Sequence, residues 1–73
     1  MIFAKRLRSR DHVKQFLVDD VQDSGWEVRE ELDNHVVKRT WTHDWHHVEH
    51  AMMRFALEAG QLRQAGWVDV PAA

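Results

Sequence analysis

The sequence predicts an α+β fold: a small antiparallel sheet of two to three strands, covered on one face by a long C-terminal helix, in β-β-β-α order. Two patterns lead to this fold class. Apolar residues recur at helical spacing between residues 45 and 67, and they alternate with polar residues between residues 26 and 42. The 73 residues are expected to form a single small domain, near the size at which one hydrophobic core only just suffices.

The helix is predicted from six apolar residues that lie three or four positions apart. They are Trp45, Val48, Met52, Phe55, Ala59 and Leu62. At about 100° per residue, this spacing places all six on one face, which can be buried against a sheet. Thr42 or Asp44 is expected to cap the first turn. Gly66 is expected to end the helix in a Schellman motif, in which Trp67 contacts Leu62.

Residues 26–42 are predicted to form a β-hairpin. Asp33 and Asn34 suit a two-residue turn, because both side chains tolerate left-handed backbone angles. Regular pairing from this turn places Trp26 opposite Trp41, so that both indoles face the helix. The opposite face is then predicted to be an ordinary solvent-exposed surface that carries Glu27, Arg29, Glu31, Lys38 and Thr40.

Four other parts of the chain have weaker patterns. Residues 12–19 are predicted to be a strand, because a third strand widens the surface that the helix can cover, although residues 12–21 also fit a short helix. Residues 1–11 are expected to be a flexible basic arm. Residues 68–73 are expected to be an apolar tail that covers a sheet edge, binds back along the helix or exchanges between two chains. Gly60 is expected to mark a close helix–sheet contact, with a solvent-facing position as the alternative.

Composition narrows the classes of function. The net charge of −2 gives no general attraction to nucleic acid or to an acidic membrane. There are no cysteines, which fits a reducing compartment, and no apolar run is long enough for a transmembrane helix. We therefore expect a cytoplasmic protein. Because the core is small, we also expect a protein partner, which could be a second copy of the chain in a homodimer.

Histidines are concentrated around the predicted helix start. His43, His46, His47 and His50 lie close together in the sequence, and His46 and His50 share one helix face. Imidazoles at this spacing can converge on a metal ion, so zinc or another divalent metal at His43, His46 and His50 is one hypothesis. The zincin pattern is absent, because His47 stands where that pattern requires Glu. The alternative interpretation is a set of surface histidines without a cofactor.

A second stripe on the helix points away from the main apolar face. Met53 and Leu57 lie four residues apart, close to the line of His46 and His50. Apolar groups gathered at an exposed position are typical of a contact surface. We therefore predict an interaction site at Met53, Leu57, His46 and His50; the alternative is that the N-terminal segment packs over them.

No motif indicates catalysis. The sequence has no nucleophile elbow, no glycine-rich phosphate loop and no dinucleotide fingerprint. The predicted function is therefore a noncatalytic protein-interaction or regulatory module. One alternative is a nucleic-acid accessory domain, whose candidate contacts are Lys5, Arg6, Arg8 and Arg10, with Arg29 and Lys38. The other alternative is a metal-binding domain at the histidine cluster.

Overall fold

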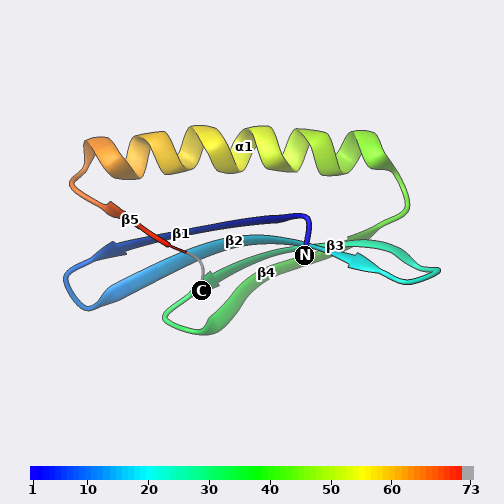
Figure 1. Ribbon diagram of the computed structural model, residues 1–73, viewed down its shortest axis with the longest axis horizontal. Coiled ribbons are helices and arrows are strands. Elements are labelled where there is room, and N and C mark those ends of the chain that lie inside the picture. Colours follow the sequence, from blue (N-terminus) through cyan, green and yellow to red (C-terminus); the bar gives the residue numbers. More distant parts are fainter. Residues whose placement is uncertain (72–73) are drawn as a thin grey trace.

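The computed structural model describes residues 1–71, which form one five-stranded antiparallel sheet and one helix. The elements are β1 (Phe3–Ser9), β2 (His12–Val21), β3 (Gly25–Leu32), β4 (His35–Thr42), α1 (Trp45–Gln64) and β5 (Val68–Val70). The strands lie in the order β4-β3-β2-β1-β5, and the helix lies across one face of the sheet (Figure 1). The predicted α+β class is thus confirmed, but the sheet has more strands than predicted, since four precede the helix and one follows it.

The predicted flexible basic arm at residues 1–11 is wrong, because residues 3–9 form β1. Side chains of a strand alternate between its two faces, so Arg6 and Arg8 lie on one face while Phe3 and Leu7 lie on the other. Leu7 is fully buried. The tail covers a sheet edge, because residues 68–70 pair with β1. Residues 72–73 of the tail lie outside the described residues.

The turn between β3 and β4 has the predicted form. Asp33 and Asn34 have φ angles of 52° and 67°, the left-handed values that a type I′ turn requires at both central residues. Leu32 pairs with His35 across the turn. The predicted strand at residues 12–19 is also confirmed, because β2 runs from His12 to Val21.

Regular pairing fails beyond this turn. Glu31 pairs with Val36 but Glu30 pairs with Lys38, so β4 contains one extra residue, Val37, in a β-bulge. The bulge shifts every later pair by one position. Trp26 therefore pairs with Thr42, and the predicted Trp26–Trp41 pair is wrong.

The shift moves the side chains of β4 to the opposite faces. Trp41 now shares the open face with Glu27, its partner on β3, and its side chain is 57% exposed. Lys38 and Thr40 lie on the helix side instead of the predicted solvent-exposed side. Trp26 keeps its place under the helix, where its ring packs against Trp45 at a centroid distance of 5.2 Å.

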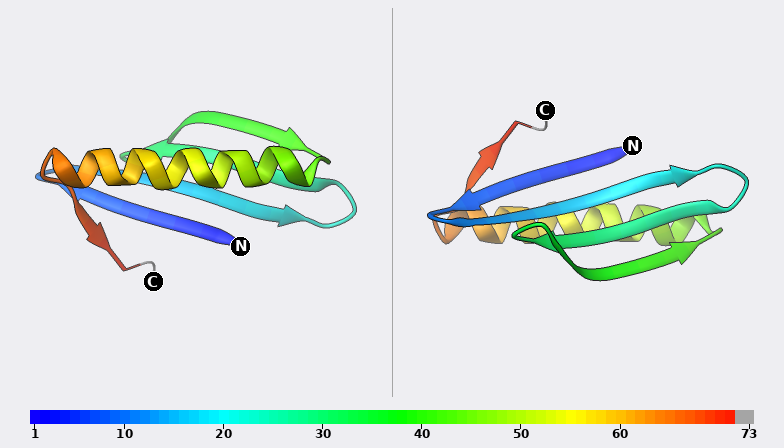
Figure 2. Two further views of the ribbon diagram at one scale, coloured as in Figure 1. Left: turned by 90° about the horizontal axis from the view of Figure 1, so that it is seen from above. Right: turned by 90° about the horizontal axis from the view of Figure 1, so that it is seen from below.

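The core lies between the sheet and the helix. Buried apolar side chains come from β1, β2, β3 and α1, and they are Leu7, Phe16, Val18, Val28, Val48, Ala51, Phe55 and Ala59. Phe16 and Phe55 stack with ring centroids 4.8 Å apart. Seen from above, the helix runs over the middle of the sheet, with β4 on one side and β5 on the other (Figure 2).

Both helix ends have the predicted caps. Asp44 is the N-cap, and its carboxylate accepts a hydrogen bond from His46 N at 2.9 Å. At the other end Trp67 N donates to Leu62 O at 2.9 Å and Gly66 N donates to the carbonyl of Arg63, which is the Schellman arrangement. Within residues 1–71, no helix combines the length and the apolar character needed to cross a membrane.

Candidate interaction site

The outward side of α1 carries the residues that we predict to form an interaction site. Five turns of helix present a continuous line of uncharged or imidazole side chains to solvent, which we call the outer stripe: His46, His50, Met53, Leu57, Gln61 and Gln64. At about 100° per residue, this line lies opposite the buried face that contains Val48 and Phe55. No residue of the outer stripe is Asp, Glu, Lys or Arg.

Two large apolar side chains stand at the centre of the outer stripe. Met53 is 64% exposed and Leu57 is 69% exposed. The alternative in which the N-terminal segment packs over them is wrong, because that segment forms β1 beneath the helix. None of the described elements lies over the outward side of α1 (Figure 1). The structure therefore leaves this apolar pair in solvent.

Gly60 borders the outer stripe and does not contact the sheet. A Cβ atom built on Gly60 has no neighbour within 4 Å, so the expected close helix–sheet contact is wrong. A glycine in a helix interior is unfavourable by roughly 1 kcal/mol relative to alanine. Its effect here is a notch in the helix surface next to Leu57.

The metal-site hypothesis rests on histidines near the start of α1. Among the described residues 1–71, no group of three or more His, Asp or Glu side chains is placed to hold a metal ion, so His43, His46 and His50 are not brought together as ligands. His46 instead has Nδ1 3.5 Å from a carboxylate oxygen of Glu49, one turn along the helix.

The predicted basic contacts are divided between two faces of the sheet. Lys5 lies on the helix side, where its Nζ is 3.7 Å from a carboxylate oxygen of Asp69. Arg6 and Arg8 lie on the open side, and Arg10 lies in the turn between β1 and β2. The four residues therefore do not present one continuous basic patch.

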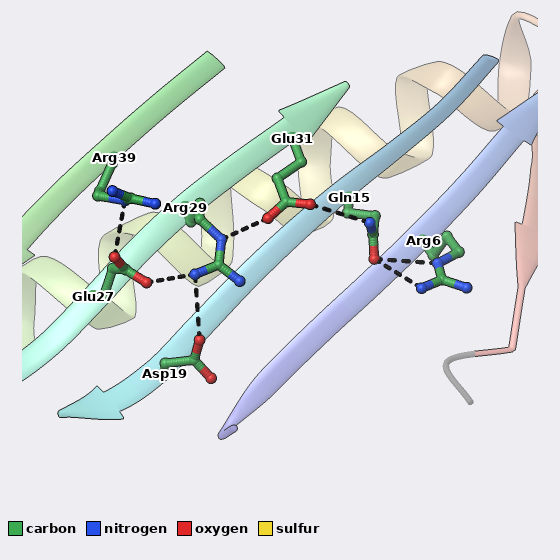
Figure 3. Close-up of polar contacts among 7 residues, drawn as sticks. All are labelled: Arg6, Gln15, Asp19, Glu27, Arg29, Glu31 and Arg39. Carbon is green, nitrogen blue, oxygen red and sulfur yellow. Dashed lines mark hydrogen bonds and ion pairs between the residues drawn. The ribbon is translucent and has the colours of Figure 1, made fainter. Parts of the chain in front are cut away.

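The open face of the sheet carries a network of ion pairs and hydrogen bonds that the sequence did not predict (Figure 3). The network crosses four strands and consists of Arg39, Glu27, Arg29, Asp19, Glu31, Gln15 and Arg6. Arg29 is at its centre, in contact with Glu27, Asp19 and Glu31. Glu27 lies between two arginines, with carboxylate oxygens 2.6 Å from Arg29 Nη1 and 2.9 Å from Arg39 Nε. Although none of the described elements covers this face, Glu27 is only 6% exposed.

The other half of the network links the central strands. Arg29 Nε donates to Glu31 at 2.7 Å, and Gln15 Nε2 donates to Glu31 at 3.3 Å. Arg6 in turn donates to Gln15 Oε1 from Nε and Nη2, at 3.1 and 3.0 Å. Among the described residues, no buried side-chain nitrogen or oxygen lacks a partner. The network therefore satisfies itself and leaves no buried polar group aimed at a ligand.

A hollow of about 430 Å³ lies beside this network, next to the turns at one end of the sheet. Arg6 and Arg8 line it, and so do Asp11 and Asp33. Because basic and acidic groups are mixed there, the hollow has no preference for a ligand of one charge.

The unpaired edge of β4 is a second exposed apolar surface. Val36 and Val37 are exposed at one end of this edge strand and Trp41 at the other. Lys38 and Arg39 stand between them, and charged side chains on an edge strand oppose pairing with another strand. The edge is therefore less suited to self-pairing than the outer stripe is to helix packing.

Asp33 ties the turn between β3 and β4 to the start of β2. Its Oδ1 accepts a hydrogen bond from Val13 N at 2.8 Å, and its Oδ2 lies 2.8 Å from His12 Nδ1. The hydrogen bond to Asp33 raises the pKa of His12 above 6.5, and the bond to His12 lowers the pKa of Asp33 below 3.8. Both groups are exposed, so this contact fixes the turn locally and forms no site.

Comparison of the chain with known protein families, with curated proteins and with solved structures gives no match.

Proposed function

We propose that this chain is a noncatalytic protein-interaction module whose contact surface is the outer stripe of α1. One observation carries the proposal: Met53 and Leu57 remain 64% and 69% exposed in a domain that has few apolar side chains to spare for its core. Exposing a pair of large apolar groups to water is unfavourable, and burying them against a partner removes that surface from water at roughly 25 cal/mol per Å².

The surroundings of this pair support a protein as the partner. Residues of the outer stripe carry amide and imidazole groups, which form hydrogen bonds at the rim of a contact, and no fixed charge has to be desolvated there. The helix is about 30 Å long, so its exposed side offers a straight surface that another helix can pack along.

Site-specific photo-crosslinking in cells that produce the chain tests this proposal. A photoreactive residue replaces Leu57 in one variant and Val37 in a matched control, since Val37 is a comparably exposed apolar residue on β4. We expect covalent protein adducts from position 57 and few or none from position 37. Adducts of equal yield from both positions, or none from position 57, would contradict the outer stripe as the contact surface.

A further inference from the structure

We propose that a second hollow, at the end of the sheet where β1 turns into β2, binds the phosphate group of a small organic phosphate monoester. The hollow has a volume of about 590 Å³, which is within the range of small-molecule sites. It is lined by Arg8, Ser9, Arg10, Ala65, Gly66 and Val68. None of these residues belongs to the outer stripe, so the proposal goes beyond the proposed function and does not depend on it.

The charge of this hollow has one sign. Arg8 and Arg10 line it, and no acidic residue does. Elsewhere arginines are engaged, since Arg29, Arg39 and Arg63 each contact a carboxylate. Within residues 1–71, by contrast, neither Arg8 nor Arg10 has a carboxylate oxygen within 4 Å. The planar fork of a guanidinium group matches the oxygens of a phosphate, so two such groups beside one hollow favour that anion.

The acidic residues closest in sequence belong to other surfaces. Asp11 follows Arg10 in the turn but lines the hollow of mixed charge, which shares Arg8 with this one. Asp69 has its carboxylate 2.5 Å from Arg63 Nε, so its charge is already paired. Neither carboxylate lines the hollow that we assign to a phosphate group.

The C-terminal end of α1 forms the other wall. A helix C-terminus is equivalent to about half a negative charge, which opposes an anion, but the two arginines contribute two full positive charges. The Schellman ending already satisfies two of the last carbonyl groups. Ala65 and Val68 add apolar surface to this wall, and Val68 is 65% exposed. This side of the hollow therefore suits the organic part of the ester.

The backbone at Arg10 is unusual for its residue type. Only Arg10 and Asp11 form the turn between β1 and β2, because Ser9 pairs with His12. Arg10 has a φ of 54°, in the left-handed region that glycine, asparagine and aspartate adopt most easily. In the other two hairpins, positive φ angles occur at residues of those types, which are Asp23, Gly25, Asp33 and Asn34. A long basic side chain held in such a conformation is typical of a functional position.

NMR titration of the natural chain with phenyl phosphate and with inorganic phosphate, at constant ionic strength, tests the proposal. We expect saturable shifts of the amide signals of residues 8–10 and 65–68, with a dissociation constant for phenyl phosphate on the order of 1 mM. Inorganic phosphate should bind more weakly, because it has no apolar part. Arg8→Gln and Arg10→Gln should each weaken binding about tenfold, because each removes a charged donor.

Arg54→Gln is the matched control. It removes the same charge from an exposed position on α1 that does not line the hollow, and it should leave the affinity unchanged. Arg10→Gly should also lose binding, yet it should unfold at an equal or higher denaturant concentration, because glycine adopts the turn conformation without strain. The same readout thus separates a role in binding from a role in folding.

Equal weakening by Arg54→Gln and Arg10→Gln would overturn the site, because net charge alone would then explain the binding. Shifts that do not saturate, or that lie away from the hollow, would also overturn it. Equal affinity for the two probes would overturn the ester and assign the hollow to free phosphate. A less stable Arg10→Gly variant would overturn the strain at this turn. Crosslinking from position 57 is independent of all these outcomes, so the failure of this proposal is distinguishable from the failure of the proposed function.

Discussion

On the helix side of the sheet, Phe16 and Val18 are fully buried under α1. On the open side of the same sheet, Glu27 and Arg29 form an ion pair that belongs to a larger network. Leu17 shows the effect of that network. It lies on the open face directly across from Arg29, yet it is 7% exposed. Long charged side chains can cover apolar surface with their aliphatic stems while their charged ends pair with one another. One layer of helix therefore suffices for a five-stranded sheet, because the second face supplies its own cover.

The comparison predicts that the apolar face contributes most to stability. Phe55→Ala removes the ring that stacks on Phe16 at 4.8 Å and should lower the free energy of unfolding by about 3–5 kcal/mol, because a buried cavity remains. The control is Leu57→Ala on the exposed side of the same helix, for which a change within about 0.5 kcal/mol is expected. Chemical denaturation at low protein concentration, where self-association is minimal, measures both.

A domain of this length is expected to have only roughly 4–11 kcal/mol of stability. If Phe55→Ala does not fold, Phe55→Leu offers a milder change with an expected loss below about 1.5 kcal/mol. Equal losses for substitutions at the buried residue 55 and the exposed residue 57 would refute the assignment of the core.

A substitution in the network on the open face should have an intermediate effect on the free energy of unfolding. Glu27→Gln keeps the shape of the side chain but removes the charge that engages Arg29 and Arg39. We expect the free energy of unfolding to fall by about 1–3 kcal/mol, and added salt should narrow the difference from the natural chain. Glu58→Gln is the matched control, since Glu58 pairs with Lys14 at 3.3 Å in a partly exposed position, where a loss of about 0–1 kcal/mol is expected. If Glu27→Gln lowers the free energy of unfolding no more than Glu58→Gln does, the network adds little to the stability of the fold.

The smallest effect on stability is expected at the turn between β3 and β4, where the Asp33 carboxylate contacts the exposed His12 ring. Asp33→Asn keeps the left-handed turn and an oxygen for Val13 N, but it removes the carboxylate. NMR titration of the His12 ring should therefore show its pKa falling toward 6.5, while the other five histidine signals stay unchanged. An unaltered His12 titration would contradict the contact.

The same pair gives the sign of a pH effect. The pKa of His12 is raised above 6.5 in the folded state. Its contribution to the stability of the fold is therefore complete below pH 6.5 and is lost as the pH rises through the folded pKa. The pKa of Asp33 is lowered below 3.8, so its contribution is complete above 3.8 and is lost as the pH falls through the folded pKa. The contact therefore stabilises the fold most between about pH 3.8 and 6.5, and Asp33→Asn should remove this dependence.

The helix could be predicted because its determinants are local. The spacing of Val48 and Phe55, the cap at Asp44 and the Schellman ending at Gly66 all lie within or beside the element. The two-residue turn was predictable for the same reason. The exposure of Met53 and Leu57 followed from helical geometry alone, so the candidate site was recognisable before the fold was known.

The parts that were missed depend on contacts between distant residues. β1 mixes apolar and basic residues without a clean alternation, and its strand character becomes clear only when Leu7 meets the helix core. The network links Arg6, Gln15 and Glu31 on three strands, so it requires the order β1-β2-β3, which no local pattern specifies. The charges at Glu27, Arg29 and Glu31 were visible as an alternating series, but their near-burial was not.

The extra residue at Val37 shows how a short strand can accommodate an inserted residue. In an alternating ladder, one inserted residue would reverse the facing of every position that follows it, unless a bulge absorbs the insertion. Here the bulge absorbs Val37, so Trp41 stays on the open face opposite Glu27 and Thr40 stays on the helix side opposite Val28. A chain lacking Val37 would keep the partners of Lys38, Arg39 and Thr40 on β3 and lose only the irregularity, so residue 37 acts as a spacer rather than as part of the pairing code.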